Sequence, residues 1–147
     1  MDIAASEAIW LLPPALPVAL FIAYGDLKFM KITNAAVLLM AGIFLFFGFI
    51  ALPFYGWLWQ IAQMLIMLLV GILAHGLRLM GGGDAKYLAA IAGFVAPADV
   101  PVVLILFAVS LLAAFTFHRL ARAVPFVRRR TPDWKSWESG TLFPMGL

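Results

Sequence analysis

The sequence predicts an all-α membrane protein, a polytopic bundle of transmembrane helices. Of its 147 residues, 65% are hydrophobic and only 12% are charged, whereas a soluble domain is about half apolar and about a quarter charged. The apolar residues form long runs separated by short polar or proline-containing stretches. The absence of cysteine excludes disulfides, thiolate zinc sites and cysteine nucleophiles. We expect a single membrane-embedded domain over residues 1–147.

Five apolar segments are expected to be transmembrane helices, over residues 9–24, 34–52, 57–77, 84–95 and 101–117. The first contains Pro13, Pro14 and Pro17, which can start or bend a helix. No basic stretch precedes it, so we expect it to remain in the mature protein rather than be cleaved as a signal peptide. Thr33 or Asn34 is a suitable cap for the second helix. The fourth is short, because even if it reached residue 98 it would rise roughly 21 Å against a hydrocarbon core of about 30 Å.

All ten Lys and Arg residues are predicted to lie on one side of the membrane. They follow the first, third and fifth segments and are Lys28, Lys31, Arg78, Lys86, Arg119, Arg122, Arg128, Arg129, Arg130 and Lys135. In a chain of five alternating spans, these three places share one side, which the positive-inside rule assigns to the cytoplasm. We therefore expect a multi-pass protein with an external N-terminus.

The stretch over residues 125–147 combines arginines with Trp134 and Trp137. Such a basic, aromatic segment is typical of a chain lying on an anionic leaflet. Nucleic-acid binding is the alternative for this composition, but the segment is tethered to membrane helices. We expect membrane lipids, anionic ones included, as its partners, and no nucleic acid.

Two aspartates at the borders of apolar segments are candidate functional residues, because a carboxylate there is costly. Asp26 ends the first segment, and Asp84 opens the fourth after Gly81, Gly82 and Gly83. The short fourth segment places Asp84 below the membrane surface, and the charge pattern places Asp26 on the same cytoplasmic side. We hypothesise that the two form an intramembrane dyad.

Two carboxylates within hydrogen-bonding range share one proton, because ionising both is costly. The ionised member can deprotonate water, while the protonated member polarises a peptide carbonyl and later protonates the leaving nitrogen. This chemistry hydrolyses an amide, and we expect no metal and no cofactor. The glycines would let a substrate backbone approach closely. Taken singly, Asp84 could instead be a helix cap, and Asp26 an interfacial charge beside Lys28.

Residues 81–86, Gly-Gly-Gly-Asp-Ala-Lys, resemble the GxGDxK motif of prepilin peptidases. Asp26 followed by Ile32-Thr33-Asn34 resembles the other signature of that family, an Asp a few residues before Ile-Pro-Asn, with Thr33 in place of Pro. The size is similar to that of the short prepilin peptidases of tight-adherence (Flp) pilus systems.

The resemblance implies an aspartic peptidase of the bacterial inner membrane that removes the short basic leader of pilin or pseudopilin precursors at the cytoplasmic face. It makes Asp26 and Asp84 the catalytic pair and gives Lys86 and Asn34 supporting roles. N-methylation is not expected, because nothing corresponds to the cysteine-bearing domain of larger members. The family has a sixth helix entered through a Pro-x-Gly turn. Residues 143–147 resemble that turn, but no residues follow them in this sequence. We therefore expect five helices here and not the sixth that the family has.

Two other functions fit parts of the pattern. Presenilin-type intramembrane proteases also use GxGD, but Tyr24-Gly25-Asp26 lacks the adjacent Tyr-Asp typical of them. A non-enzymatic membrane scaffold or cation-coupled transporter could use the same aspartates to bind a cation or a proton. In that case no peptide would be cut.

Overall fold

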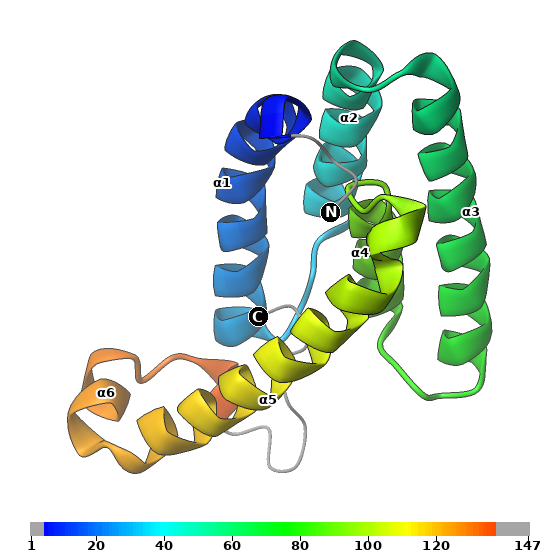
Figure 1. Cartoon of the computed structure of the whole chain (residues 1–147). Helices are drawn as coiled ribbons and strands as arrows, with labels where there is room; N and C mark the ends of the chain where they lie inside the picture. Colours follow the sequence, from blue (N-terminus) through cyan, green and yellow to red (C-terminus); the bar gives the residue numbers. More distant parts are fainter. Residues whose placement is uncertain (1–4, 138–147) are drawn as a thin grey trace.

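The computed structural model describes residues 5–137, and its regular elements are all helical (Figure 1). They are α1 (Ala5–Phe29), α2 (Asn34–Ala51), α3 (Phe54–Gly76), α4 (Gly82–Ala92), the 3₁₀ turn η1 (Pro97–Asp99), α5 (Val100–Ala123), α6 (Pro125–Arg130) and the 3₁₀ turn η2 (Lys135–Trp137). In this part of the chain, α1, α2, α3 and a span ending with α5 are long and apolar enough to cross a membrane. The predicted all-α membrane bundle is confirmed.

The fourth predicted span is the short helix α4. Its 11 residues rise about 16 Å, which is about half of a hydrocarbon core. It packs against α3 and α2, and Figure 1 shows it among the longer helices. A short element whose ends lie at membrane depth is tolerated where protein surrounds it, so α4 depends on its neighbours for its position.

The core joins α1, α2 and α4. Its buried apolar side chains come from these helices and the α1–α2 connection, and they are Ile22, Ile32, Ala36, Val37, Met40 and Ala90. The small residues of α4 allow close approach: a Cβ built on Gly71 of α3 would lie only 3.0 Å from the Cβ of Ala85. Helix association in lipid relies on such small residues. We call residues 5–92 the four-helix part.

Side chains and backbone turns fix the ends of these helices. Thr33 caps α2 as expected, with its Oγ1 accepting a 3.4 Å hydrogen bond from the backbone N–H of Ala36. At the far end of α4, the Nε2 of Gln63 donates to the carbonyls of Ala92 and Val95, at 2.8 and 3.1 Å. Gln63 therefore satisfies carbonyls that the end of a helix leaves without intrahelical partners.

Among residues 5–137, two residues other than glycine adopt the left-handed conformation, Met30 with φ 52° and Arg78 with φ 60°. Each follows the last residues of a long helix. The N–H of Met30 donates to the carbonyl of Asp26 at 2.8 Å, closing α1. After α3, the N–H groups of Arg78 and Leu79 donate to His75 and Ala74, both at 2.9 Å. This second pattern is the Schellman motif, in which glycine normally occupies the left-handed position.

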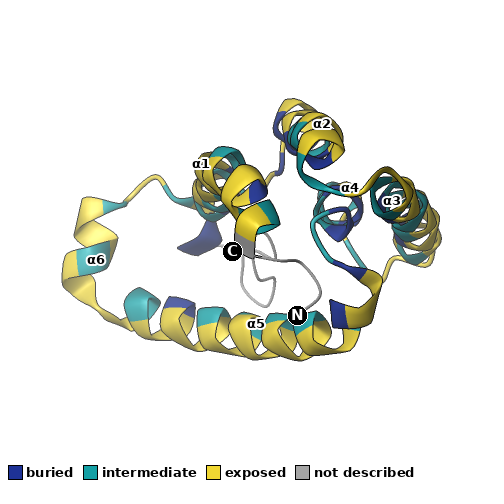
Figure 2. Ribbon diagram, turned by 45° about the horizontal axis from the view of Figure 1, so that its top comes forward, coloured by how far each residue is buried: buried dark blue, intermediate teal, exposed yellow. Residues whose placement is uncertain are grey.

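Residues 100–137, which we call the arm, pack differently. Figure 2 shows α5 exposed along most of its length. The span ending with α5 has 0% of its most apolar window buried, against 28% for α2. The arm returns to the four-helix part at η2, which contacts α1. There the rings of Tyr24 and Trp134 meet edge to face, with centroids 6.1 Å apart.

Several helix boundaries differ from the predicted ones, and two of these differences concern the aspartates. The first helix continues to Phe29, so Asp26 lies inside its last turns. The fourth begins at Gly82, so two glycines are helical and Asp84 is not the first residue. The composition of a sequence changes from apolar to polar where the chain leaves the lipid. A helix makes its own backbone hydrogen bonds, so it can continue beyond the membrane surface. The turn predicted at residues 143–147 lies outside the described residues.

Candidate active site

Asp26 is buried near the end of α1, with 5% of its surface exposed. The left-handed turn at Met30 stops the helix one turn later. A carboxyl group in this position is largely removed from water, although it lies next to the basic residues Lys28 and Lys31 in sequence. Burial of a carboxyl group is costly, which agrees with a functional role for Asp26.

Asp84 is the third residue of α4, and Gly81 is the cap. The carboxylate accepts a hydrogen bond from the backbone N–H of Gly81. This is the return bond of a capping box, in which an acid at the third helical position satisfies the N–H of the cap. A Cβ on Gly81 would lie 2.6 Å from Oδ2 of Asp84. The expectation that Asp84 itself might be the cap is therefore wrong.

The connection between α1 and α2 brings the two aspartates to the same end of the four-helix part. A Cβ on Gly83, next to Asp84, would lie 3.2 Å from the Cβ of Ile32. On the other side, a Cβ on Gly25, next to Asp26, would lie 3.8 Å from the carbonyl oxygen of Lys31. The backbone at Lys31 and Ile32 thus lies between the residues that precede each aspartate.

Lys86 and Asn34, which the motifs also single out, are in direct contact. The Nζ of Lys86 donates a 3.0 Å hydrogen bond to the Oδ1 of Asn34. This bond joins α4 to the first residue of α2 across 52 positions of sequence. Both side chains also line a mainly apolar hollow of about 420 Å³ between α2, α3 and α4. Lys86 therefore places a positive charge beside an apolar surface.

Each of the three glycines of the motif lies near another part of the protein. Gly81 lies against the carboxylate of Asp84, Gly83 lies against Ile32, and a Cβ on Gly82 would lie 3.4 Å from the His75 ring. His75 is held over this turn, since its Nδ1 lies 3.1 Å from the carbonyl oxygen of Met80. An added Cβ would displace a neighbour at Gly81 and at Gly83, whereas at Gly82 it would make only an ordinary van der Waals contact. The predicted role of the glycines in admitting a substrate backbone stays a prediction.

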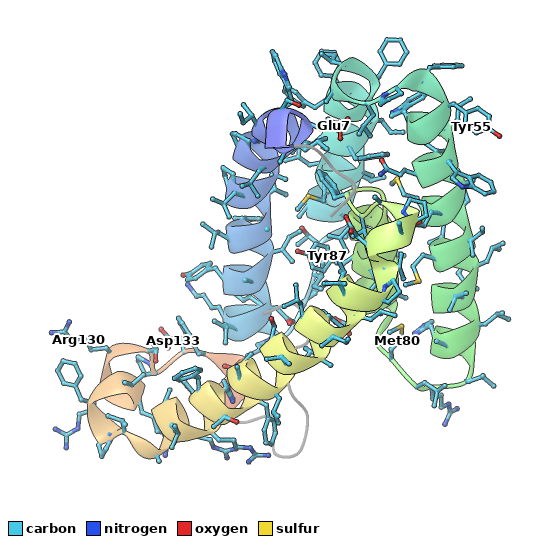
Figure 3. All side chains as sticks on the ribbon, viewed as in Figure 1. Glu7, Tyr55, Met80, Tyr87, Arg130 and Asp133 are labelled. Carbon is cyan, nitrogen blue, oxygen red and sulfur yellow. The ribbon has the colours of Figure 1, made fainter. Side chains whose placement is uncertain are left out.

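Tyr87 shares a cavity with Asp84, a relation that the motif did not include. Both residues line a hollow of about 200 Å³ between α4 and α5, together with Phe107 and Leu111. Figure 3 shows Tyr87 in the space between α1 and α4. The sequence could have indicated that Tyr87 lies beside Asp84, because the two are three residues apart and such residues lie on the same face of a helix.

The sequence model of the type IV leader peptidase family matches residues 15–117. This match covers more than half of the chain and includes both aspartates, the three glycines, Asn34 and Lys86. The chain belongs to the type IV leader peptidase family. Searches among curated proteins and among solved structures found no match. The family and the apolar helices together identify a membrane-embedded peptidase.

Proposed function

We propose that this chain is an aspartic endopeptidase that cleaves the short basic leader from pilin or pseudopilin precursors. One observation carries the proposal: the fold brings the residues before Asp26 and Asp84, both inside the region that matches the family, against one short connection. Asp26 and Asp84 share a proton in this proposal, so that one carboxylate deprotonates water while the other acid protonates the leaving nitrogen. Lys86, Asn34 and the glycines support the site.

The surroundings support the reaction at one face of a bacterial inner membrane. Lys28, Lys31, Arg78 and Lys86 all belong to the helix ends near the two aspartates. By the positive-inside rule this end faces the cytoplasm and the N-terminus lies outside. The apolar hollow beside Lys86 offers a surface for the apolar residues that would follow a substrate's leader. The aspartate pair needs neither metal nor cofactor for amide hydrolysis.

The decisive experiment uses the full chain in detergent with a pilin precursor, and follows leader release by gel electrophoresis. Asp26→Asn and Asp84→Asn should each slow cleavage by about 10²–10⁴-fold, the usual contribution of acid–base catalysis. Asp133→Asn is the matched control, because Asp133 is exposed and lies on the arm. Cleavage at the wild-type rate by either dyad variant, with its helical circular dichroism unchanged, would refute the proposal.

A second experiment tests whether the two positions come close enough to act together. The chain has no cysteine, so Asp26→Cys with Asp84→Cys introduces the only two thiols. A short bis-maleimide should link this pair in membranes, giving a shifted band after a protease cut between the two positions. The control pair joins Asp26→Cys with Asp99→Cys, since Asp99 follows the opposite end of α4. Equal yields from the two pairs would contradict a shared site.

A further inference from the structure

A basic hollow lies in the arm, outside the region that matches the family. It has a volume of about 490 Å³ and lies between the end of α5, α6 and the residues up to η2. Arg122, Arg128 and Arg129 all line it. The family match ends at residue 117, so the peptidase assignment does not explain why three guanidinium groups gather here.

The structure divides the arginines of the arm into two groups. The guanidinium of Arg119 lies 5.1 Å from the Phe115 ring centroid, and that of Arg130 lies 4.6 Å from the centroid of Phe126. Figure 3 shows Arg130 on the outer side of α6. Neither residue lines the hollow. The sequence presents five similar arginines, whereas the fold directs three of them to one place.

Trp137 forms a fixed wall of the hollow. It is buried, with 6% of its surface exposed, and its indole N–H donates to the carbonyl oxygen and to the Oγ1 of Thr131, at 2.9 and 3.1 Å. Its ring also stacks on His118, with centroids 5.0 Å apart and planes at 16°. Two hydrogen bonds and a stacked ring hold this wall, so the hollow does not depend on exposed side chains alone.

The positive charges that line the hollow favour binding of an anion. Among the described residues that line it, three are arginines and none is Asp or Glu. Like charges placed together are unfavourable unless a counter-charge lies between them. The guanidinium group, with donors in a planar fork, binds the oxygens of a phosphate in pairs. A phosphate group is therefore the ligand that suits these three side chains best.

The length of α5 supports a place for the hollow near lipid phosphates, if α5 crosses the membrane as its length and composition allow. The 24 residues of α5 rise about 36 Å, slightly more than the hydrocarbon core, and Arg122 is in the last turn. Tryptophan is enriched at the membrane–water interface, and Trp137 lines this hollow. We propose that this hollow binds a phosphate group, carried by an anionic phospholipid of the surrounding leaflet or by free phosphate.

The test compares two double variants of the full chain that lose the same charge. Phosphatidylglycerol is titrated onto the detergent-solubilised protein, and bound lipid is counted by native mass spectrometry. Arg128→Gln with Arg129→Gln should weaken binding of one lipid about tenfold or more, since it removes two charge-assisted donors. Arg119→Gln with Arg130→Gln should change it by less than about twofold, because these residues lie outside the hollow. Equal weakening in both would overturn the proposal, because it would mean general surface attraction.

Two further experiments identify the source of the phosphate and control for misfolding. If inorganic phosphate binds to the wild type and displaces the lipid, the hollow takes free phosphate; if only phosphatidylglycerol binds, the ligand is the phospholipid. Arg122→Lys keeps the charge but loses the paired donors, and should weaken binding several-fold. Wild-type binding by Arg122→Lys and by the Arg128/Arg129 variant, each with unchanged circular dichroism, would equally overturn the proposal.

Discussion

The four-helix part and the arm are both strongly apolar, yet their packing differs. The span that ends with α5 is the most apolar of the four candidate spans and has none of its most apolar window buried. In α4, which is too short to be such a span, Ala85, Ala89, Ala90 and Ala92 are all buried. Lipid solvates an apolar side chain as well as protein does, so hydrophobicity does not bring membrane helices together. Small residues and interhelical hydrogen bonds do, and the candidate active site lies where they gather.

The largest expected effect tests this comparison directly. Met40 is a core residue with 2% of its surface exposed, whereas Leu112 on α5 is 68% exposed. Met40→Ala should lower the free energy of unfolding by about 2–5 kcal/mol, because it leaves a cavity. Leu112→Ala should change it by less than about 0.5 kcal/mol. Unfolding by SDS in mixed micelles measures both, and a similar loss in the two variants would mean that the arm is packed as tightly as the core.

A smaller effect tests the close contact between α3 and α4. Gly71 is buried against Ala85, whereas a Cβ on Gly42 of α2 meets nothing within 4 Å. Gly71→Ala should destabilise the protein by about 1–3 kcal/mol through overpacking, and it should also slow leader cleavage because it displaces the helix that carries Asp84. Gly42→Ala should be neutral or stabilise by up to about 1 kcal/mol, since alanine favours a helix. The same SDS titration applies, and a harmless Gly71→Ala would show that α4 has room to shift.

The sequence predicted the helices better than it predicted how they pack, and the side of the membrane on which the aspartates lie stays a prediction. Long apolar runs indicate spans whatever surrounds them. The short run after Asp84 was predicted to be one of five transmembrane helices, but in the structure it is an 11-residue helix that is not among the four candidate spans. Two contacts were not predictable, because they join residues far apart in sequence. Gln63 closes the end of α4 from another helix, and the bond from Lys86 to Asn34 joins the two motifs. The arginines of the arm looked equivalent for the same reason, since only the fold separates the stacked ones from those in the hollow.

The left-handed residues provide the smallest test. Among the described residues, the two non-glycine positions with positive φ both belong to the four-helix part, at the ends of α1 and α3. Strained backbone persists where the surrounding packing determines it, so its position agrees with the tighter packing of this part. Arg78 occupies a place that normally favours glycine, and it lies six residues before Asp84. The turn that leads to the candidate site therefore carries strain.

Arg78→Gly and Arg78→Ala remove the same charge and differ only in the backbone that they permit. Alanine keeps the cost of the left-handed conformation, about 1–2 kcal/mol, whereas glycine does not. The glycine variant should therefore be the more stable of the two by about 1 kcal/mol in the SDS titration, because its more flexible unfolded chain offsets part of the gain. If alanine proved equal or better, this turn would not be left-handed in the membrane. If the glycine variant also cleaved more slowly than the alanine variant, the strained turn would help to hold α4 in place near His75. The rigidity of the four-helix part would then contribute to catalysis as well as to stability.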